Sequence, residues 1–216
     1  MEDLKPIKTD FVHESKKLFV VFGGIAAGIG MPPFEFVKSL NIVSESRVFV
    51  RDLRKNWYQS GLPGISNNIE GTKEYLESVI REQSPSEVVM VGNSMGGYAA
   101  IMFSALIGNS RAVAFAPQTF ISPLKRLRHR DYRWINQILD TYKHSWNKRA
   151  IWDLQKLNYE GNWRADLHVC NRNRLDYLHA MNLSKLPQVT IHEYEFGGHA
   201  LVKKLRDSGE LASILK

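Results

Sequence analysis

The chain has 216 residues, a net charge of +7 and one cysteine, Cys170. This length suits a single domain with a sizeable core, and one thiol excludes an internal disulfide. Because Cys170 ends the apolar run ADLHVC, we interpret it as a buried structural thiol rather than a catalytic one. The first residues lack a signal-peptide core, and no apolar stretch approaches the roughly 18 residues of a membrane span, so we expect a cytoplasmic protein.

Positive charge is concentrated in residues 125–149, where eight basic residues against two acids give a net charge of +6. Aromatic residues lie among them, and that mixture can indicate nucleic-acid binding. No recognition motif accompanies it, so we expect no nucleic-acid partner. Two interpretations stay open: a solvated helical face, or a face that meets an anionic substrate or carrier.

Short apolar runs alternate with helix-length segments, which is typical of a parallel sheet with crossover helices. The expected strands cover residues 18–22, 47–50, 87–91, 112–116, 166–170 and about 188–195. The expected helices follow Pro32-Pro33, cover about 69–81, follow Ser94, and start near His199. We therefore predict a three-layer α/β/α sandwich with a mostly parallel sheet of about six strands.

About fifty residues, roughly 117–164, separate the fourth and fifth expected strands, whereas a βα connection normally needs far fewer. The segment has helical spacing, with a set of apolar and aromatic residues expected on one side: Trp134, Ile135, Ile138, Leu139 and Tyr142. We interpret it as a helical cap, or lid, over the C-terminal edge of the sheet, inserted in one domain that spans residues 1–216.

Residues 92–96 read Gly-Asn-Ser-Met-Gly and fit the pattern G-x-S-x-G. A serine on a tight strand-to-helix turn requires these glycines, because side chains two residues to either side would collide. The turn would place Ser94 at a helix N-terminus, where free N–H groups favour developing negative charge. We predict that Ser94 is a nucleophile; the alternative is a glycine-rich turn that binds a phosphate or nothing.

From residue 18 to the C-terminal helix the chain resembles the α/β-hydrolase superfamily, and residues 92–97, GNSMGG, look like that family's nucleophile elbow. The family's order of serine, acid and histidine implies Ser94, Asp176 and His199. His199, in a glycine-rich loop after the last strand, would be the base. Asp176 is the only acid in the loop after the fifth strand, but a helix N-cap or first-turn residue is the alternative.

The resemblance also implies an oxyanion hole made by the backbone N–H groups of Met95 and Gly24. Gly24 belongs to Phe22-Gly23-Gly24-Ile25, which is similar to the family's His-Gly-Gly loop with phenylalanine in place of histidine. A plain glycine turn is the alternative. Ile25 is a second candidate donor, and we expect Ile25 and Asn93 to contact the substrate.

Three functions fit these features. The first is a serine hydrolase that cleaves a carboxylic ester by acyl transfer through Ser94, without a metal or cofactor. The second is a thioesterase for carrier-bound or CoA-bound acyl groups, because GNSMGG and GGHALV also look like segments of discrete thioesterases. The third is a non-catalytic binding protein of this fold. Arg51 and Asp52 end the second strand at the same edge, where they could contact substrate or form a structural ion pair.

Overall fold

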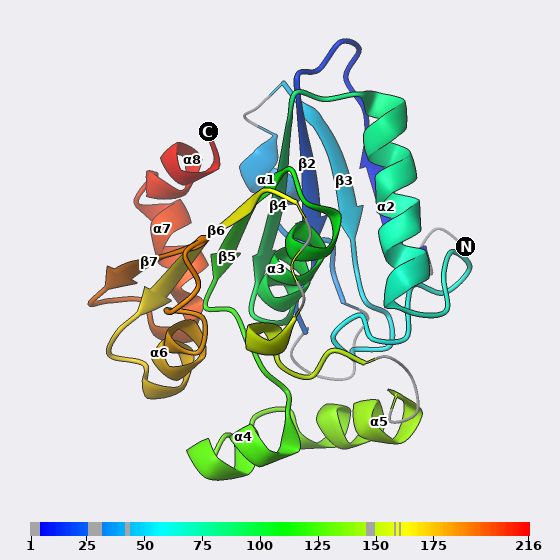
Figure 1. The fold of residues 1–216 in the computed structure, drawn as a ribbon. Helices are drawn as coiled ribbons and strands as arrows, with labels where there is room; N and C mark the ends of the chain where they lie inside the picture. Colours follow the sequence, from blue (N-terminus) through cyan, green and yellow to red (C-terminus); the bar gives the residue numbers. More distant parts are fainter. Residues whose placement is uncertain (1–4, 26–31, 42–43, 146–149, 158, 160) are drawn as a thin grey trace.

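The computed structural model describes residues 5–216, apart from 26–31, 42–43, 146–149, 158 and 160. The strands are β1 (Ile7–Asp10), β2 (Lys17–Phe22), β3 (Ser46–Val50), β4 (Glu87–Asn93), β5 (Ser110–Phe115), β6 (Trp163–Cys170) and β7 (Val189–Tyr194). They form one sheet in the order β1-β3-β2-β4-β5-β6-β7, in which β1 is antiparallel to β3 and every other neighbouring pair is parallel (Figure 1).

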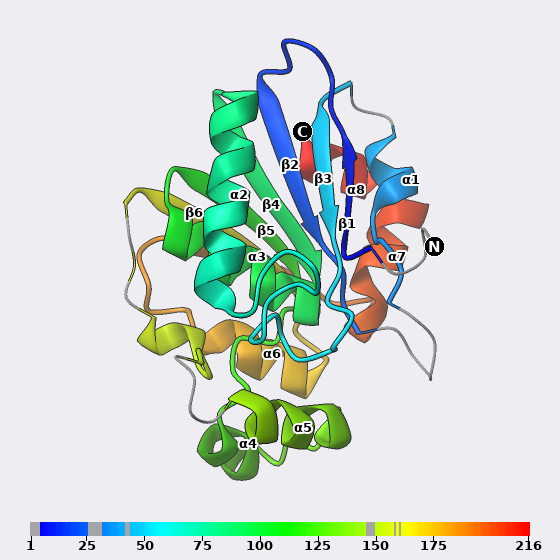
Figure 2. The same ribbon diagram turned by 90° about the vertical axis from the view of Figure 1, so that its right-hand side faces the viewer.

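The helices are α1 (Val37–Leu40), α2 (Ile69–Gln83), α3 (Met95–Ile107), α4 (Pro123–His129), α5 (Ile135–Ser145), α6 (Arg174–Met181), α7 (Leu201–Asp207) and α8 (Glu210–Leu215). Two single 3-10 turns are η2 (Leu154–Lys156) and η3 (Gly198–Ala200). Figure 2 shows α2 and α3 on one face of the sheet and α1, α7 and α8 on the other. Within the described ranges, every helix is too short or too polar to cross a bilayer.

The central strands are buried on both faces, as continuous apolar runs predict. In β2, Leu18 and Val20 pack toward α2 and α3, whereas Phe19 and Val21 pack in a second apolar cluster with α7 and α8. The side chains alternate because successive residues of a strand point to opposite faces. The three-layer α/β architecture predicted from the sequence is therefore confirmed.

The six predicted strands are present, and the structure adds β1, which was not predicted. Its sequence, IKTD, has one apolar side chain and is mostly exposed, so it lacks the pattern of a buried strand. It pairs at the sheet edge, with Ile7 opposite Val50. The helix expected directly after Pro32-Pro33 begins later, at Val37.

The segment predicted as a cap forms the β5–β6 connection, residues 116–162, which contains α4 and α5. Both helices lie beyond the edge at which the parallel strands end (Figure 1, Figure 2). The predicted apolar side packs on the core only in part. Trp134, Ile138 and Tyr142, spaced four residues apart, pack against the core, but Ile135 and Leu139 are 43% and 54% exposed. The stripe that packs is therefore narrower than predicted.

Backbone crowding around residue 94 explains the glycines of the motif. A Cβ on Gly92 would lie 2.1 Å from the carbonyl oxygen of Gly96, and a Cβ on Gly96 would lie 2.1 Å from the carbonyl oxygen of Phe22. Real Cβ atoms essentially never approach a backbone atom so closely. Only glycine therefore allows α3 to start against the ends of β2 and β4.

We expect Gly96→Ala to lower the free energy of unfolding by about 3 kcal/mol, because the added methyl group overlaps backbone that cannot move aside. Urea denaturation followed by circular dichroism measures this loss. Gly209→Ala is the control, because nothing lies within 4 Å of its added Cβ, although Gly209, unlike Gly96, has positive φ (+82°). The control should cost about 1 kcal/mol, the strain of that backbone conformation alone. Equal losses in the two variants would contradict the crowding argument.

Candidate active site

Ser94 lies on the turn between β4 and α3, with φ 54° and ψ −116°. A residue other than glycine rarely adopts positive φ, and such strain costs about 1–3 kcal/mol. The surrounding backbone holds the turn: the Ser94 N–H donates to Phe115 O at 2.9 Å, and the Ser94 carbonyl accepts from the N–H groups of Tyr98 and Gln118 at 3.1 and 3.2 Å. This is the strained strand-to-helix turn that the G-x-S-x-G pattern predicts.

His199 and Asp176 are brought together, as the sequence predicted. His199 lies in η3, and its Nδ1 is 3.1 and 3.0 Å from the two carboxylate oxygens of Asp176. Asp176 is a first-turn residue of α6, and its N–H donates to the N-cap side chain of Asn173. Asp176 is therefore both a first-turn residue of α6, which was the structural alternative, and the hydrogen-bond partner of His199. With Nδ1 facing a carboxylate, Nε2 is the nitrogen left for proton transfer.

The electrostatics of Asp176 favour its ionised form. Burial of the carboxyl raises its pKa, but hydrogen bonds and charge from His199 and Arg133 outweigh burial and leave the pKa below its ordinary value. An ionised carboxylate is the partner that stabilises an imidazolium formed during proton transfer. Ser94 lies at the same sheet edge, but its hydroxyl makes no hydrogen bond with His199 in this structure. Catalytic hydrogen bonds are often long in enzymes without bound substrate and shorten when substrate binds.

The predicted oxyanion donors lie beside the elbow. Met95 is the first residue of α3, so its N–H is one of those without a partner inside the helix. Gly24 follows β2, and a Cβ built on it would lie 3.0 Å from the carbonyl oxygen of Asn93. The side-chain oxygen of Asn93 is buried and has no hydrogen-bond partner among the described residues. Ile25 is partly buried and packs on the core.

Glu35 is a site residue that the sequence did not reveal. Its carboxyl oxygen would lie 3.2 Å from a Cβ on Gly24, and the backbone N–H of Gly24 favours the ionised form of this carboxyl. Burial raises the pKa of Glu35 to about 7, although Gly24 and the nearby His199 oppose the rise. No motif marks Glu35, which is simply an acid between two phenylalanines, so only the folded chain places it next to a predicted oxyanion donor.

Arg51 and Asp52 have structural contacts rather than the ion pair considered from the sequence. The Asp52 carboxylate is fully buried and accepts hydrogen bonds from the N–H groups that follow it: Arg54 at 2.9 Å, Asn56 at 2.7 Å and Tyr58 at 2.9 Å. The Arg51 guanidinium lies 4.3 Å from the centre of the Phe34 ring. Asp52 therefore organises the loop after β3.

Cys170 is buried, as its position at the end of an apolar run predicted. Within the described ranges, no three histidine, cysteine, aspartate or glutamate side chains come close enough together to hold a metal ion.

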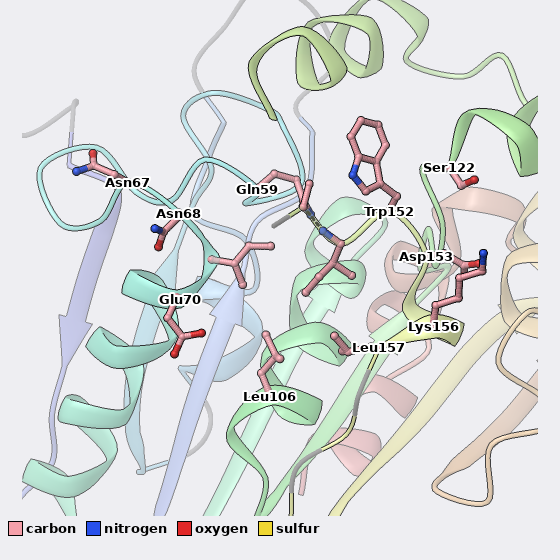
Figure 3. Close-up of a pocket in the computed structure, with 13 residues that line it drawn as sticks. Gln59, Asn67, Asn68, Glu70, Leu106, Ser122, Trp152, Asp153, Lys156 and Leu157 are labelled. Atoms are coloured by element: carbon pink, nitrogen blue, oxygen red, sulfur yellow. Dashed lines mark hydrogen bonds between the residues drawn. The ribbon is translucent and has the colours of Figure 1, made fainter. Parts of the chain in front are cut away.

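A cavity of about 1220 Å³ lies between the start of α2, Leu106 of α3 and residues 150–157. Figure 3 shows the Trp152 ring on one side of the cavity and Leu106 on another. Gln59 connects two of its walls, because its side-chain oxygen accepts the Ile151 N–H at 2.8 Å. None of the three predicted catalytic side chains lines it.

No protein-family model and no curated protein sequence matches the chain, but solved structures do. The capsule O-acetyltransferase of Neisseria meningitidis serogroup A is 13% identical and covers 97% of this chain and 90% of its own, with a TM-score of 0.67. An α/β serine hydrolase without a lid from Xanthomonas campestris is 14% identical over 97% and 87%, with a TM-score of 0.54. An esterase from Exiguobacterium antarcticum is 11% identical over 97% and 95%, with a TM-score of 0.55.

At 11–14% identity, these similarities concern the fold. They agree with the seven-stranded, mostly parallel sheet and the helices on its two faces. The chain therefore has the α/β-hydrolase fold.

Proposed function

We propose that the protein is a serine hydrolase that cleaves a carboxylic ester by acyl transfer through Ser94. The observation that carries this proposal is the contact between His199 and the buried Asp176, at the sheet edge where the Ser94 turn also lies. A base oriented by a carboxylate is what a weakly acidic serine hydroxyl requires to become a nucleophile.

In the proposed reaction, Ser94 Oγ attacks the ester carbonyl while His199 takes the hydroxyl proton. The N–H groups of Gly24 and Met95 hold the oxyanion that forms. When this intermediate collapses, the leaving alcohol takes the proton from His199 and the acyl group stays on the serine. Water then attacks the acyl-enzyme by the same route, which releases the carboxylic acid and restores Ser94.

A second candidate is O-acyl transfer to a sugar hydroxyl. It is favoured by the similarity to the capsule O-acetyltransferase, whose TM-score of 0.67 is higher than those of the serine hydrolase and the esterase, 0.54 and 0.55. The first half of the reaction would be unchanged, and a hydroxyl would replace water in the second half. A thioesterase would differ only in the leaving group, whereas a non-catalytic binding protein would form no acyl-enzyme.

We expect a fluorophosphonate probe to add once to the wild-type protein and not to Ser94→Ala, as measured by intact mass. The reason is that the probe reacts with a serine whose hydroxyl is activated by a base. Ser78→Ala is the matched control, because Ser78 is an exposed serine on α2 whose hydroxyl bonds only a nearby carbonyl, and it should label like wild type. If wild type stays unlabelled while a reference serine hydrolase reacts, the binding-protein alternative would replace this proposal.

The two acyl-transfer candidates separate by product. With an activated acetyl ester as donor, a hydrolase is expected to release acetate at a rate that added oligosaccharide leaves unchanged. Mass spectrometry of the same mixture detects any acetylated sugar. Sugar acetylation that depends on Ser94 and lowers acetate release would favour the transferase over the hydrolase.

We also expect Glu35→Gln to change the pH dependence of labelling. Because the pKa of Glu35 is raised to about 7, its carboxyl is neutral below that pH and ionised above it. The ionised form would compete for the Gly24 N–H and repel the negative charge of the transition state. The wild-type labelling rate should therefore fall above about pH 7, and the rate of Glu35→Gln should not. Superimposable alkaline profiles would rule out this role for Glu35.

A further inference from the structure

Behind the candidate site lies a second histidine–carboxylate pair, His179 and Asp131, and both side chains are almost fully buried. His179 Nε2 is 3.0 Å from Asp131 Oδ2, and the Thr119 N–H donates to His179 Nδ1 at 3.0 Å. Because Nδ1 accepts a hydrogen bond, Nε2 carries the proton and donates it to Asp131. Burial lowers the pKa of His179, so this histidine is neutral and structural.

Arg133 joins this pair to the candidate site. One of its terminal nitrogens, Nη1, lies 2.7 Å from Asp176 Oδ1, and its Nε and Nη2 bind Asp131 Oδ1 and Oδ2 at 3.0 and 2.9 Å. The Arg133 carbonyl in turn accepts a hydrogen bond from Arg126 at 2.6 Å. A guanidinium held bidentately on one carboxylate is fixed in direction, so its remaining nitrogen is aimed at Asp176.

The Asp176 carboxylate is consequently shared between a permanent cation and the predicted base. Its Oδ1 is within hydrogen-bond distance of both Arg133 and His199. A nearby positive charge offsets the negative charge that would otherwise draw a proton onto the imidazole. Asp131 reduces this effect in part, because it faces Arg133 from the other side.

We propose that Arg133 is a positioning residue: it fixes the Asp176 carboxylate for His199, and its positive charge offsets part of the attraction of that carboxylate for a proton on the imidazole. The proposal rests on the proposed function, in which His199 acts only when neutral. Arg133 belongs to the β5–β6 connection, between α4 and α5, so the same contact ties that connection to the base.

Other charged groups lie close to Arg133 and His199 and also affect the protonation that the experiment measures. Glu35 acts on His199 from the segment before α1, and Asp131 and Arg126 face Arg133 from the β5–β6 connection. His179 contributes no charge while neutral. Because Glu35 titrates near pH 7, the pH profiles are compared in the Glu35→Gln background as well as in wild type.

The experiment measures two quantities against pH: the rate constant of fluorophosphonate labelling, and the NMR titration of the His199 ring. In Arg133→Gln, the acidic limb of labelling and the His199 titration midpoint should both move up by about one pH unit. Arg133→Lys keeps the charge but not the bidentate fork, so both should lie closer to the wild-type values than in Arg133→Gln. Arg128→Gln removes an exposed arginine from the same connection and should change neither.

In Asp131→Asn the His199 titration midpoint is expected to move in the opposite direction from Arg133→Gln. This variant replaces Arg133→Gln in the test if that variant does not fold. Removing that anion leaves the charge of Arg133 less balanced, so the His199 midpoint should move down. A folded Arg133→Gln with an unmoved midpoint, or an Asp131→Asn midpoint that moves up, would overturn the proposal. The NMR midpoint decides this even if wild type proves unreactive toward the probe, an outcome that would instead remove the proposed function.

Discussion

Close backbone packing at the start of α3 is the constraint on which the rest of the site depends. Gly96 lies against the Phe22 carbonyl and Gly92 against Gly96, so the ends of β2 and β4 and the first turn of α3 meet without intervening side chains. This approach forces Ser94 into positive φ and sets it beside Gly24, which follows β2. The proposed nucleophile and a proposed oxyanion donor thereby come from strands 70 residues apart in the chain, as neighbours in one sheet.

On the side of the site that carries Asp176 and His199, balanced charge acts in addition to this backbone packing. Asp176 is buried, and it stays ionised because Arg133 and His199 both bind it. Arg133 also pairs with Asp131. The two buried carboxylates, Asp131 and Asp176, therefore face Arg126 and Arg133 of the β5–β6 connection. Removing one member of this buried set of charges would leave another charge buried without a partner. The resulting loss of stability is far larger than the net stability that the intact set contributes. The site and this connection are thus electrostatically one unit.

The sequence predicted the features that depend on local pattern. Strands buried on both faces appear as apolar runs, and the Ser94 turn requires glycines at fixed positions, so both could be placed without coordinates. β1 could not, because an exposed edge strand such as IKTD needs no apolar pattern. The roles of Glu35 and Arg133 could not be predicted either. Arg133 is one of eight basic residues in a 25-residue segment, and only the fold places it against Asp176. The outward exposure of Ile135 and Leu139 likewise follows from how α5 sits on the core, not from its own spacing.

The measurement that tests the central claim most directly is a rapid-quench reaction with p-nitrophenyl acetate, followed by peptide mapping of the quenched protein. If Ser94 carries the acyl group, the first turnover should release a burst of nitrophenolate equal to the protein concentration, with acetyl on the peptide that contains Ser94. A linear release without a burst, together with no acetyl on that peptide at any quench time, would contradict the account.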